Sequence, residues 1–149
     1  MMTNEIIRVL LADDDKDDRN DFIEAFESLK ISTTVETLKN GVQLMKYLNN
    51  PSTKLPHLLF LDLNMPKKSG LDCLLEIKQI ERLKHLTIVI YSTSSSEKDI
   101  EDTFLHGANI YIKKPAHLTV LKKTLLHVLT LNWQYYTSGM NRDNFLFHL

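Results

Sequence analysis

Carboxylate side chains stand immediately after apolar stretches at two places in this chain. Asp62 directly follows the run Leu58–Leu61 and precedes Asn64, a residue type that is common in turns. The pair Asp13 and Asp14 follows the first apolar stretch in the same way. An aspartate carboxylate can ligate a hard divalent cation, and it can also act as a nucleophile. These three aspartates are therefore the first candidates for chemistry.

Groups that could hold an anion follow two further apolar stretches. Hydroxyl side chains come after residues 87–91, and ammonium groups come after residues 110–112. Both kinds of side chain can donate hydrogen bonds to the oxygens of a phosphoryl group. The candidates are Ser92 or Thr93 in the first place and Lys113 or Lys114 in the second.

The apolar stretches are expected to be the strands of one sheet, because each is too short for a helix. Five strands are expected at 6–12, 32–38, 58–61, 87–91 and 110–112. Segments with apolar residues at helical spacing follow each of them. Five helices are expected at 16–29, 42–48, 71–80, 97–106 and 118–131. This alternation predicts an α/β fold, in which helices cover both faces of a doubly wound parallel sheet.

In an open parallel sheet the carboxyl ends of the strands lie along one edge, where ligands bind. The candidate residues of the separate strands would then meet in one site. Crowded carboxylates repel one another unless a cation joins them, and Mg²⁺ with oxygen ligands is the simplest such cation. The hydroxyl and ammonium groups would bind the remaining oxygens of a phosphoryl group. The pattern predicts an aspartyl nucleophile beside a magnesium site.

The composition of the 149-residue chain, with 43% hydrophobic and 25% charged residues, is that of one globular domain. Its 18 Lys and Arg oppose 19 Asp and Glu, and the net charge of -1 argues against binding to nucleic acid. The single cysteine, Cys73, cannot form an internal disulfide. No stretch predicts a signal peptide or a membrane span, so a cytoplasmic protein is expected.

The chain is expected to divide at the end of the last predicted helix. Residues 1–131 would form one domain, and residues 132–149 a C-terminal tail that packs on the domain or extends it, with no separate output domain. The tail is short for a second domain and too aromatic for a purely solvated segment. Its apolar residues include Trp133, Tyr135, Tyr136, Phe145, Leu146 and Phe147.

The joint pattern of Asp13-Asp14, Asp62, Ser92 and Lys114-Pro115, with the segment LDLNMPKKSG, resembles the receiver domain of bacterial two-component response regulators. The resemblance covers about residues 6–131. The chain length and the segment PHLLFLDLNMP look most like the small single-domain regulators paired with hybrid or phytochrome-type histidine kinases. The resemblance implies a flavodoxin-like receiver fold with five parallel strands in the order 2-1-3-4-5.

The resemblance also implies a role for each acidic residue of the pattern. Asp62 would be the phosphoacceptor. Asp14 would ligate Mg²⁺ directly, whereas Asp13 would act more through water. Asn64 would give its backbone carbonyl to the metal. The protein would then be a signalling phosphoacceptor whose activity is limited to self-phosphorylation and self-dephosphorylation.

Other residues would respond to the phosphoryl group, again by resemblance. Ser92 would contact a phosphoryl oxygen, Lys114 would pair with another, and Tyr111 would be an aromatic rotamer switch. A cis peptide would join Lys114 to Pro115, which only a proline makes affordable.

The expected partners follow from these roles. A histidine kinase or a phosphotransfer protein would supply the phosphoryl group. The signal would leave through the fourth helix, the fifth strand and the fifth helix to a protein partner, with a homodimer as one possibility. No nucleic acid or membrane partner is expected.

An EF-hand calcium loop is an alternative for the first acidic segment, because Asp13, Asp15, Asp17 and Glu24 match its positions one, three, five and twelve. Its sixth position would be Asp18 where the loop needs glycine, and a strand precedes it. The acidic residues after position 14 fit better as residues of a helix start.

Two other function classes are alternatives. A phosphatase with an aspartyl nucleophile would need a general acid nearby, but the residue two positions after Asp62 is Asn64. A flavodoxin-like binding module would need a phosphate-binding loop after the first strand, where this chain has aspartates that would repel a phosphate.

Overall fold

Five parallel strands form one sheet in the order β2-β1-β3-β4-β5 in the computed structural model, which describes residues 6–131 and 142–148. The strands are β1 (Ile7–Ala12), β2 (Thr33–Leu38), β3 (Leu58–Leu61), β4 (Ile88–Ser92) and β5 (Ile110–Lys113). The predicted α/β class and strand order are confirmed.

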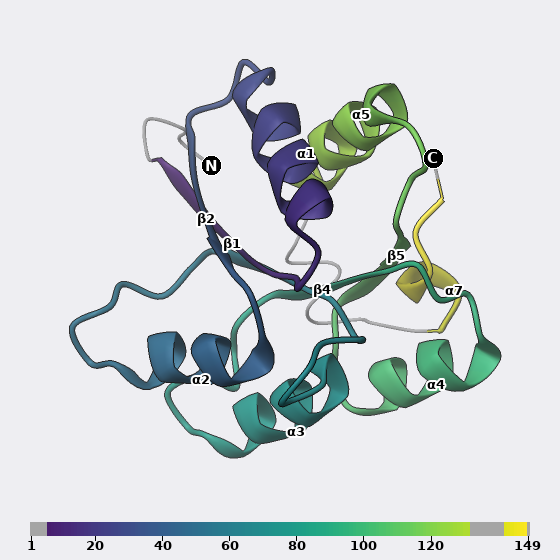
Figure 1. The fold of residues 1–149 in the computed structure, drawn as a ribbon. Helices are drawn as coiled ribbons and strands as arrows, with labels where there is room; N and C mark the ends of the chain where they lie inside the picture. The colour runs from purple at the N-terminus through teal and green to yellow at the C-terminus, as the bar shows by residue number, and fades with distance from the viewer. Residues whose placement is uncertain (1–5, 132–141, 149) are drawn as a thin grey trace.

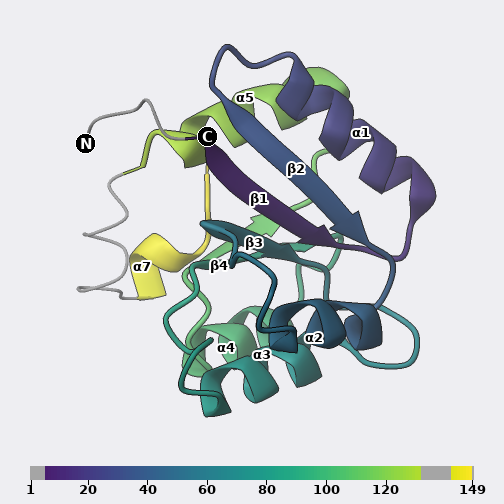
Figure 2. The same cartoon turned by 90° about the vertical axis from the view of Figure 1, so that its left-hand side faces the viewer.

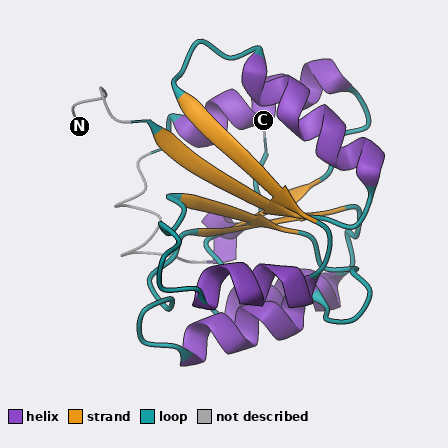
Figure 3. Cartoon of the chain, turned by 60° about the vertical axis from the view of Figure 1, so that its left-hand side comes forward, coloured by secondary structure: helices purple, strands orange, loops and turns teal. Residues whose placement is uncertain are grey.

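Helices cover both faces of the sheet, as Figures 1 and 2 show. One face carries α1 and α5, and the other carries α2, α3 and α4, so that the sheet lies between two helical layers (Figure 3). The bounds are α1 (Lys16–Glu27), α2 (Gly41–Asn49), α3 (Gly70–Gln79), α4 (Glu97–Leu105) and α5 (Leu118–Leu129). Their ends and those of the strands differ by at most two residues from the predicted ones.

Alternate residues of the central strands fill two separate cores. Leu10 and Leu59 point toward α2, α3 and α4, whereas Leu11 and Phe60 point toward α1 and α5. All four residues of β3 are buried, which explains why this strand is apolar throughout. The strand is therefore held on both faces, and its carboxyl end is fixed in position.

Side-chain caps fix the loops at the carboxyl edge of the sheet. Asp15 caps α1 by accepting a hydrogen bond from the Asp18 N–H at 2.9 Å, as expected for a residue of a helix start. Ser69 and Ser96 cap α3 and α4 in the same way. The EF-hand alternative is wrong, because residues 16–27 are helical and leave no twelve-residue calcium loop.

A short helix in the C-terminal segment, α7 (Arg142–Phe145), was not predicted, because four residues are too few for a helical period to be recognised. Phe145 is fully buried, and its ring packs against Phe104 and Tyr111 with centroid distances of 5.4 and 6.1 Å. The Phe147 N–H donates a hydrogen bond to the Tyr111 carbonyl oxygen at 2.9 Å. Three other aromatic residues of the predicted tail lie outside the described residues: Trp133, Tyr135 and Tyr136.

Among the described residues, no helix combines the length and the apolar character that crossing a membrane requires.

Candidate functional site

Asp13 and Asp62 emerge side by side because β1 and β3 are neighbours that end in register. Ala12, the last residue of β1, pairs with Leu61, the last residue of β3. The Asp62 N–H donates a hydrogen bond to the Ala12 carbonyl oxygen at 3.0 Å, which continues the ladder one residue past the strand. The two aspartates are therefore the first residues beyond adjacent strand ends.

Three carboxylates converge at this edge. One oxygen from each of Asp13, Asp14 and Asp62 lies within 4.8 Å of the other two. Asp13 and Asp62 are buried, with exposed fractions of 0% and 5%, whereas Asp14 is exposed. The geometry could hold one hard divalent cation between oxygen ligands, with the exposed side open to water.

The buried carboxylate of Asp13 has few partners for its charge. Oδ2 of Asp13 is buried and has no hydrogen bond in the described part of the chain, although the Lys114 ammonium forms an ion pair with it. A buried carboxylate oxygen normally has hydrogen-bond partners. The three aspartates offer oxygen atoms close enough together to share one cation, so the residues present fit a divalent ion.

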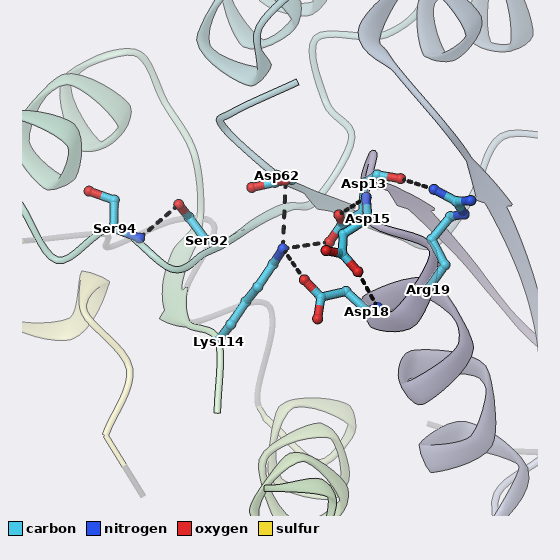
Figure 4. A network of polar contacts seen from close by, with 8 residues as sticks. All are labelled: Asp13, Asp15, Asp18, Arg19, Asp62, Ser92, Ser94 and Lys114. Carbon is cyan, nitrogen blue, oxygen red and sulfur yellow. Dashed lines mark hydrogen bonds and ion pairs between the residues drawn. The ribbon is translucent and has the colours of Figure 1, made fainter. Parts of the chain in front are cut away.

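The ammonium group of Lys114 points into the same cluster (Figure 4). Nζ lies 2.7 Å from Oδ2 of Asp13, 2.8 Å from Oδ2 of Asp18 and 3.6 Å from Oδ2 of Asp62. The Lys114 side chain is only 8% exposed. Lys113, the last residue of β5, is exposed instead. Of the two candidate lysines, Lys114 is therefore the one that reaches the carboxylates.

Burial and crowding shift the ionisation of the site. Burial, reinforced by the charges of Asp13 and Asp14, raises the pKa of Asp62 to about 6, although Lys114 opposes this shift. Burial also raises the pKa of Asp13. Burial on its own would lower the pKa of Lys114, but Asp13 and Asp18 raise it further above its usual value. Burial and neighbouring carboxylates therefore make the ionised form of Asp62 unfavourable, and Lys114 compensates its charge only in part.

Ser92 and Tyr111 are linked through the backbone of Ser94. Ser92 is fully buried at the end of β4, and its Oγ accepts a hydrogen bond from the Ser94 N–H at 3.1 Å. The Tyr111 hydroxyl donates a hydrogen bond to the Ser94 carbonyl oxygen at 2.8 Å. Thr93, the alternative to Ser92, is exposed. A movement of the loop after β4 would reach both side chains.

The loop after Asp62 folds back closely over the strand end. A Cβ atom added to Gly70 would lie 2.0 Å from the Asp62 carbonyl oxygen, so that only glycine fits there. The Gly70 N–H donates a hydrogen bond to the Leu63 carbonyl oxygen at 2.9 Å. Asn64 is exposed in this loop, and its backbone N–H lowers the pKa of Asp62 by hydrogen bonding to the carboxylate.

Sequence reasoning missed the contact of Asp18 with Lys114, because it assigned Asp18 only to the helix start. The two residues are 96 positions apart, and no local pattern joins them. Arg19 was also missed, and its Nη1 donates a hydrogen bond to the Asp13 carbonyl oxygen at 2.8 Å. Only the position of the first turn of α1 at the sheet edge brings these groups together.

The implied cis peptide between Lys114 and Pro115 is a wrong expectation, since no peptide bond among the described residues is cis. The trans form is the more stable isomer even before proline, by about 0.5–1 kcal/mol. With a trans peptide the Lys114 N–H still donates to the Ser92 carbonyl oxygen at 2.8 Å, and the side chain still enters the site.

Comparison with known proteins gives this geometry a context. Residues 9–126 match the family described as the response regulator receiver domain. The probable methanogenesis regulatory protein FilR2 of Methanothrix harundinacea is 31% identical over 91% of this chain and 86% of its own length. Response regulator Rcp1 of Synechocystis sp. is 33% identical over 77% of this chain and 81% of its own length.

Solved structures agree with the sequence comparison. The phosphorylated cyanobacterial phytochrome response regulator RcpA is 30% identical and superimposes with a TM-score of 0.78, covering 92% of this chain and 98% of its own. The Mn²⁺-bound form of Rcp1 is 28% identical, with a TM-score of 0.75, and covers 91% of this chain and 97% of its own. With its strand order, its cluster of aspartates and the family match over residues 9–126, the chain belongs to the response regulator receiver domain family and is a phosphoacceptor response regulator.

Proposed function

We propose that Asp62 is the residue that accepts the phosphoryl group. The observation that carries this proposal is the placement of its carboxylate, which is buried at the sheet edge beside two other carboxylates and 3.6 Å from an ammonium group. The Asp62 oxygen would attack phosphorus, forming an acyl phosphate, while the bond from phosphorus to the donor breaks and the donor leaves with the electron pair. Lys114 and the hydroxyl of Ser92 would bind the phosphoryl oxygens.

We propose Mg²⁺ as the divalent ion, held by the side chains of Asp13, Asp14 and Asp62 and by the backbone carbonyl of Asn64. The all-oxygen donor set supports a hard cation. The similarity to Rcp1, which has a Mn²⁺-bound structure, supports a divalent ion at this site. When bound, the ion would offset the charge that gathers on the carboxylates and phosphoryl oxygens.

A histidine kinase or a phosphotransfer protein is the proposed donor in a cytoplasmic signalling pathway. The similarity to RcpA, described as a phytochrome response regulator, supports a phytochrome-type kinase. We propose that the protein is a switch and not a turnover enzyme. Asn64 stands where a general acid would serve a phosphatase, which supports this reading over an aspartyl phosphatase.

The proposed output is a change on the surface formed by α4, β5 and α5. A phosphoryl group that draws Ser92 inward would move Ser94, which holds the Tyr111 hydroxyl. Tyr111 and the buried Phe145 are in ring contact, so this movement would also reach the C-terminal segment. We propose that residues 142–148 are part of the receiver surface, and that the changed surface binds a second copy of the chain or another protein.

The proposal is tested by incubating the protein with Mg²⁺ and acetyl phosphate and measuring intact mass. The mass is expected to rise by one phosphoryl group, and excess EDTA or Asp62→Asn is expected to prevent the rise. Asp21→Asn, which alters an exposed carboxylate on α1, is the matched control and should be labelled like the wild type. Full labelling of Asp62→Asn would contradict the assignment.

A further inference from the structure

Lys114 is held more closely by Asp18 than by the proposed phosphoacceptor. Its Nζ lies 2.8 Å from Oδ2 of Asp18, as a hydrogen bond, but 3.6 Å from Oδ2 of Asp62. The third contact is the ion pair with Asp13 at 2.7 Å. Figure 4 shows the ammonium group between these carboxylates, which come from the β1–α1 region and from the end of β3.

Several contacts restrict where the ammonium group can go. Nζ lies 5.5 Å from the centre of the buried Tyr91 ring. The hydrogen bond to Asp18 and the ion pair with Asp13 hold the ammonium group beside these two carboxylates. A phosphoryl group on Asp62 would add strongly negative acceptors next to those that Lys114 already contacts, so it would share the ammonium group with Asp13 and Asp18.

The two present partners are not equivalent. Asp13 belongs to the cluster that fits a divalent ion, and such an ion would neutralise much of its charge. Asp18 is outside that cluster, and its side chain is 35% exposed on the first turn of α1. With a metal ion in place, Asp18 is therefore the carboxylate that keeps its full attraction for the lysine.

We propose that Asp18 is a positioning residue that retains Lys114 in the unphosphorylated state and competes with the phosphoryl group for it. The inference rests on the proposed function of Asp62 and Lys114. Its consequence is reciprocal: an anion on Asp62 weakens the contact between Lys114 and Asp18, and loss of the Asp18 carboxylate favours the anion.

The helix offers a matched control for this idea. Asp17 stands next to Asp18 in the first turn of α1 and carries the same charge, but it is exposed and makes no ion pair with a described residue. Asp17→Asn and Asp18→Asn therefore remove the same charge from the same helix end. Only Asp18→Asn removes a carboxylate charge that contacts Lys114.

The test is the affinity for beryllofluoride, an anionic mimic of the phosphoryl group, measured by NMR titration of the full chain with Mg²⁺. Asp18→Asn is expected to bind the mimic about two- to fivefold more tightly than Asp17→Asn, the range expected for losing one partly exposed ion pair. Asp18→Glu restores a carboxylate and is expected to return the affinity toward that of the wild type. Equal affinities for the two Asn variants, or weaker binding by Asp18→Asn, would overturn the inference.

A measurement on the wild type keeps the test independent of how the variants fold. The ¹³Cγ signal of Asp18 and the ¹⁵Nζ signal of Lys114 should both shift when beryllofluoride is added to the Mg²⁺-loaded protein. Binding of the mimic without a shift of the Asp18 signal would overturn the inference and leave the proposed function standing. A folded wild-type protein that does not bind the mimic at all would instead overturn the proposed function.

Discussion

Ionising Asp62 in its buried position costs free energy, and this cost favours the binding of a cation. Its carboxylate is buried beside two other carboxylates, and the nearest ammonium group is closer to Asp13 and Asp18 than to Asp62. A carboxylate whose charge is poorly compensated is stabilised by any cation that enters the site. The same residue therefore weakens the metal-free fold and favours metal binding.

The first prediction concerns the stability of the metal-free protein. The pKa of Asp62 is about 6 in the folded protein but near 3.8 when the chain is unfolded. Between these values the folded state binds more protons, so the contribution of Asp62 to stability is lost as the pH rises through about 6. Asp62→Asn removes this loss, and it should raise the free energy of unfolding at neutral pH by about 1–3 kcal/mol.

Urea unfolding in the presence of EDTA measures this effect. The difference between Asp62→Asn and the wild type should shrink as the pH is lowered toward 3.8. Asp21→Asn, at an exposed position, should show no such difference. A wild type more stable than Asp62→Asn at neutral pH would contradict the burial argument.

The second prediction separates the two acidic residues that follow β1. Asp14 is exposed, whereas Asp13 is already engaged by Lys114 at 2.7 Å. Asp14→Ala should therefore reduce Mg²⁺ affinity more than Asp13→Ala, on the order of tenfold for loss of a direct carboxylate ligand. Isothermal titration calorimetry of the two variants makes the comparison, and negligible losses in both would argue against this metal site.

At the scale of elements, the site depends on how closely the start of α3 approaches the end of β3. Gly70 is the first residue of α3, and its Cα packs against the Asp62 carbonyl. Ser69 caps the helix by accepting a hydrogen bond from the Asp72 N–H at 3.1 Å. These contacts anchor the end of the loop that contains Asn64, and they fix the backbone beside the proposed phosphoacceptor.

The third prediction follows from this close approach. Gly70→Ala would place a Cβ 2.0 Å from the Asp62 carbonyl oxygen, so the two elements must separate. Overpacking of this kind typically costs about 1–3 kcal/mol. The variant should lose both stability, measured by urea unfolding, and the rate of phosphorylation by acetyl phosphate. Gly107→Ala is the control: its backbone φ of +91° also makes alanine unfavourable, but it lies after α4, and it should lose stability while being labelled at the wild-type rate.

At the scale of the whole molecule, the C-terminal segment contacts the sheet at β5. Leu146 forms an isolated parallel bridge with Tyr111, and Phe145 fills space between Tyr111 and Phe104. Arg142 adds ion pairs with Glu97 and Glu101 of α4 at 3.3 and 3.1 Å. The segment therefore touches both α4 and β5, the elements proposed to carry the signal.

The fourth prediction concerns this docking. Phe145→Ala should free the segment, raising hydrogen exchange at Tyr111 and in α4. The loss of stability should stay below the roughly 3–5 kcal/mol typical of a core phenylalanine, because the segment can detach while the sheet stays folded. His148→Ala, at an exposed position, should leave exchange unchanged. Unchanged exchange in Phe145→Ala would show that the ring contacts contribute little.

The fifth prediction tests the proposed output. Beryllofluoride with Mg²⁺ should change hydrogen exchange over residues 97–131, and light scattering should report a larger mass if the changed surface binds a second copy. Asp62→Asn is the control, and it should respond in neither measurement. If exchange over these residues does not change in the wild type while the mimic binds, the output model is wrong.

Much of the fold could be predicted from the sequence because its signals are local. The run Leu58–Leu61 is buried on both faces, so every residue in it is apolar, and the strand is recognisable without its neighbours. Helical spacing and capping residues such as Asp15 located the helices to within two residues at each end. Strand ends followed by Asp13, Asp62 and Lys114 indicated one shared edge, since parallel strands align their carboxyl ends.

Only the tertiary structure decided which residues from distant parts of the sequence contact one another. The sequence indicates only a helix-start role for Asp18. Its contact with Lys114, 96 positions away, exists only because the first turn of α1 and the carboxyl end of β5 lie at the same edge. The sequence indicates only that Phe145 is one aromatic residue of a tail. Its burial against Tyr111 depends on how residues 142–148 pack against β5 and α4. A local sequence pattern indicates the secondary structure and the burial of its own residues. Pairings between distant segments depend on packing that no short stretch of sequence contains, so they appear only when the whole chain is folded.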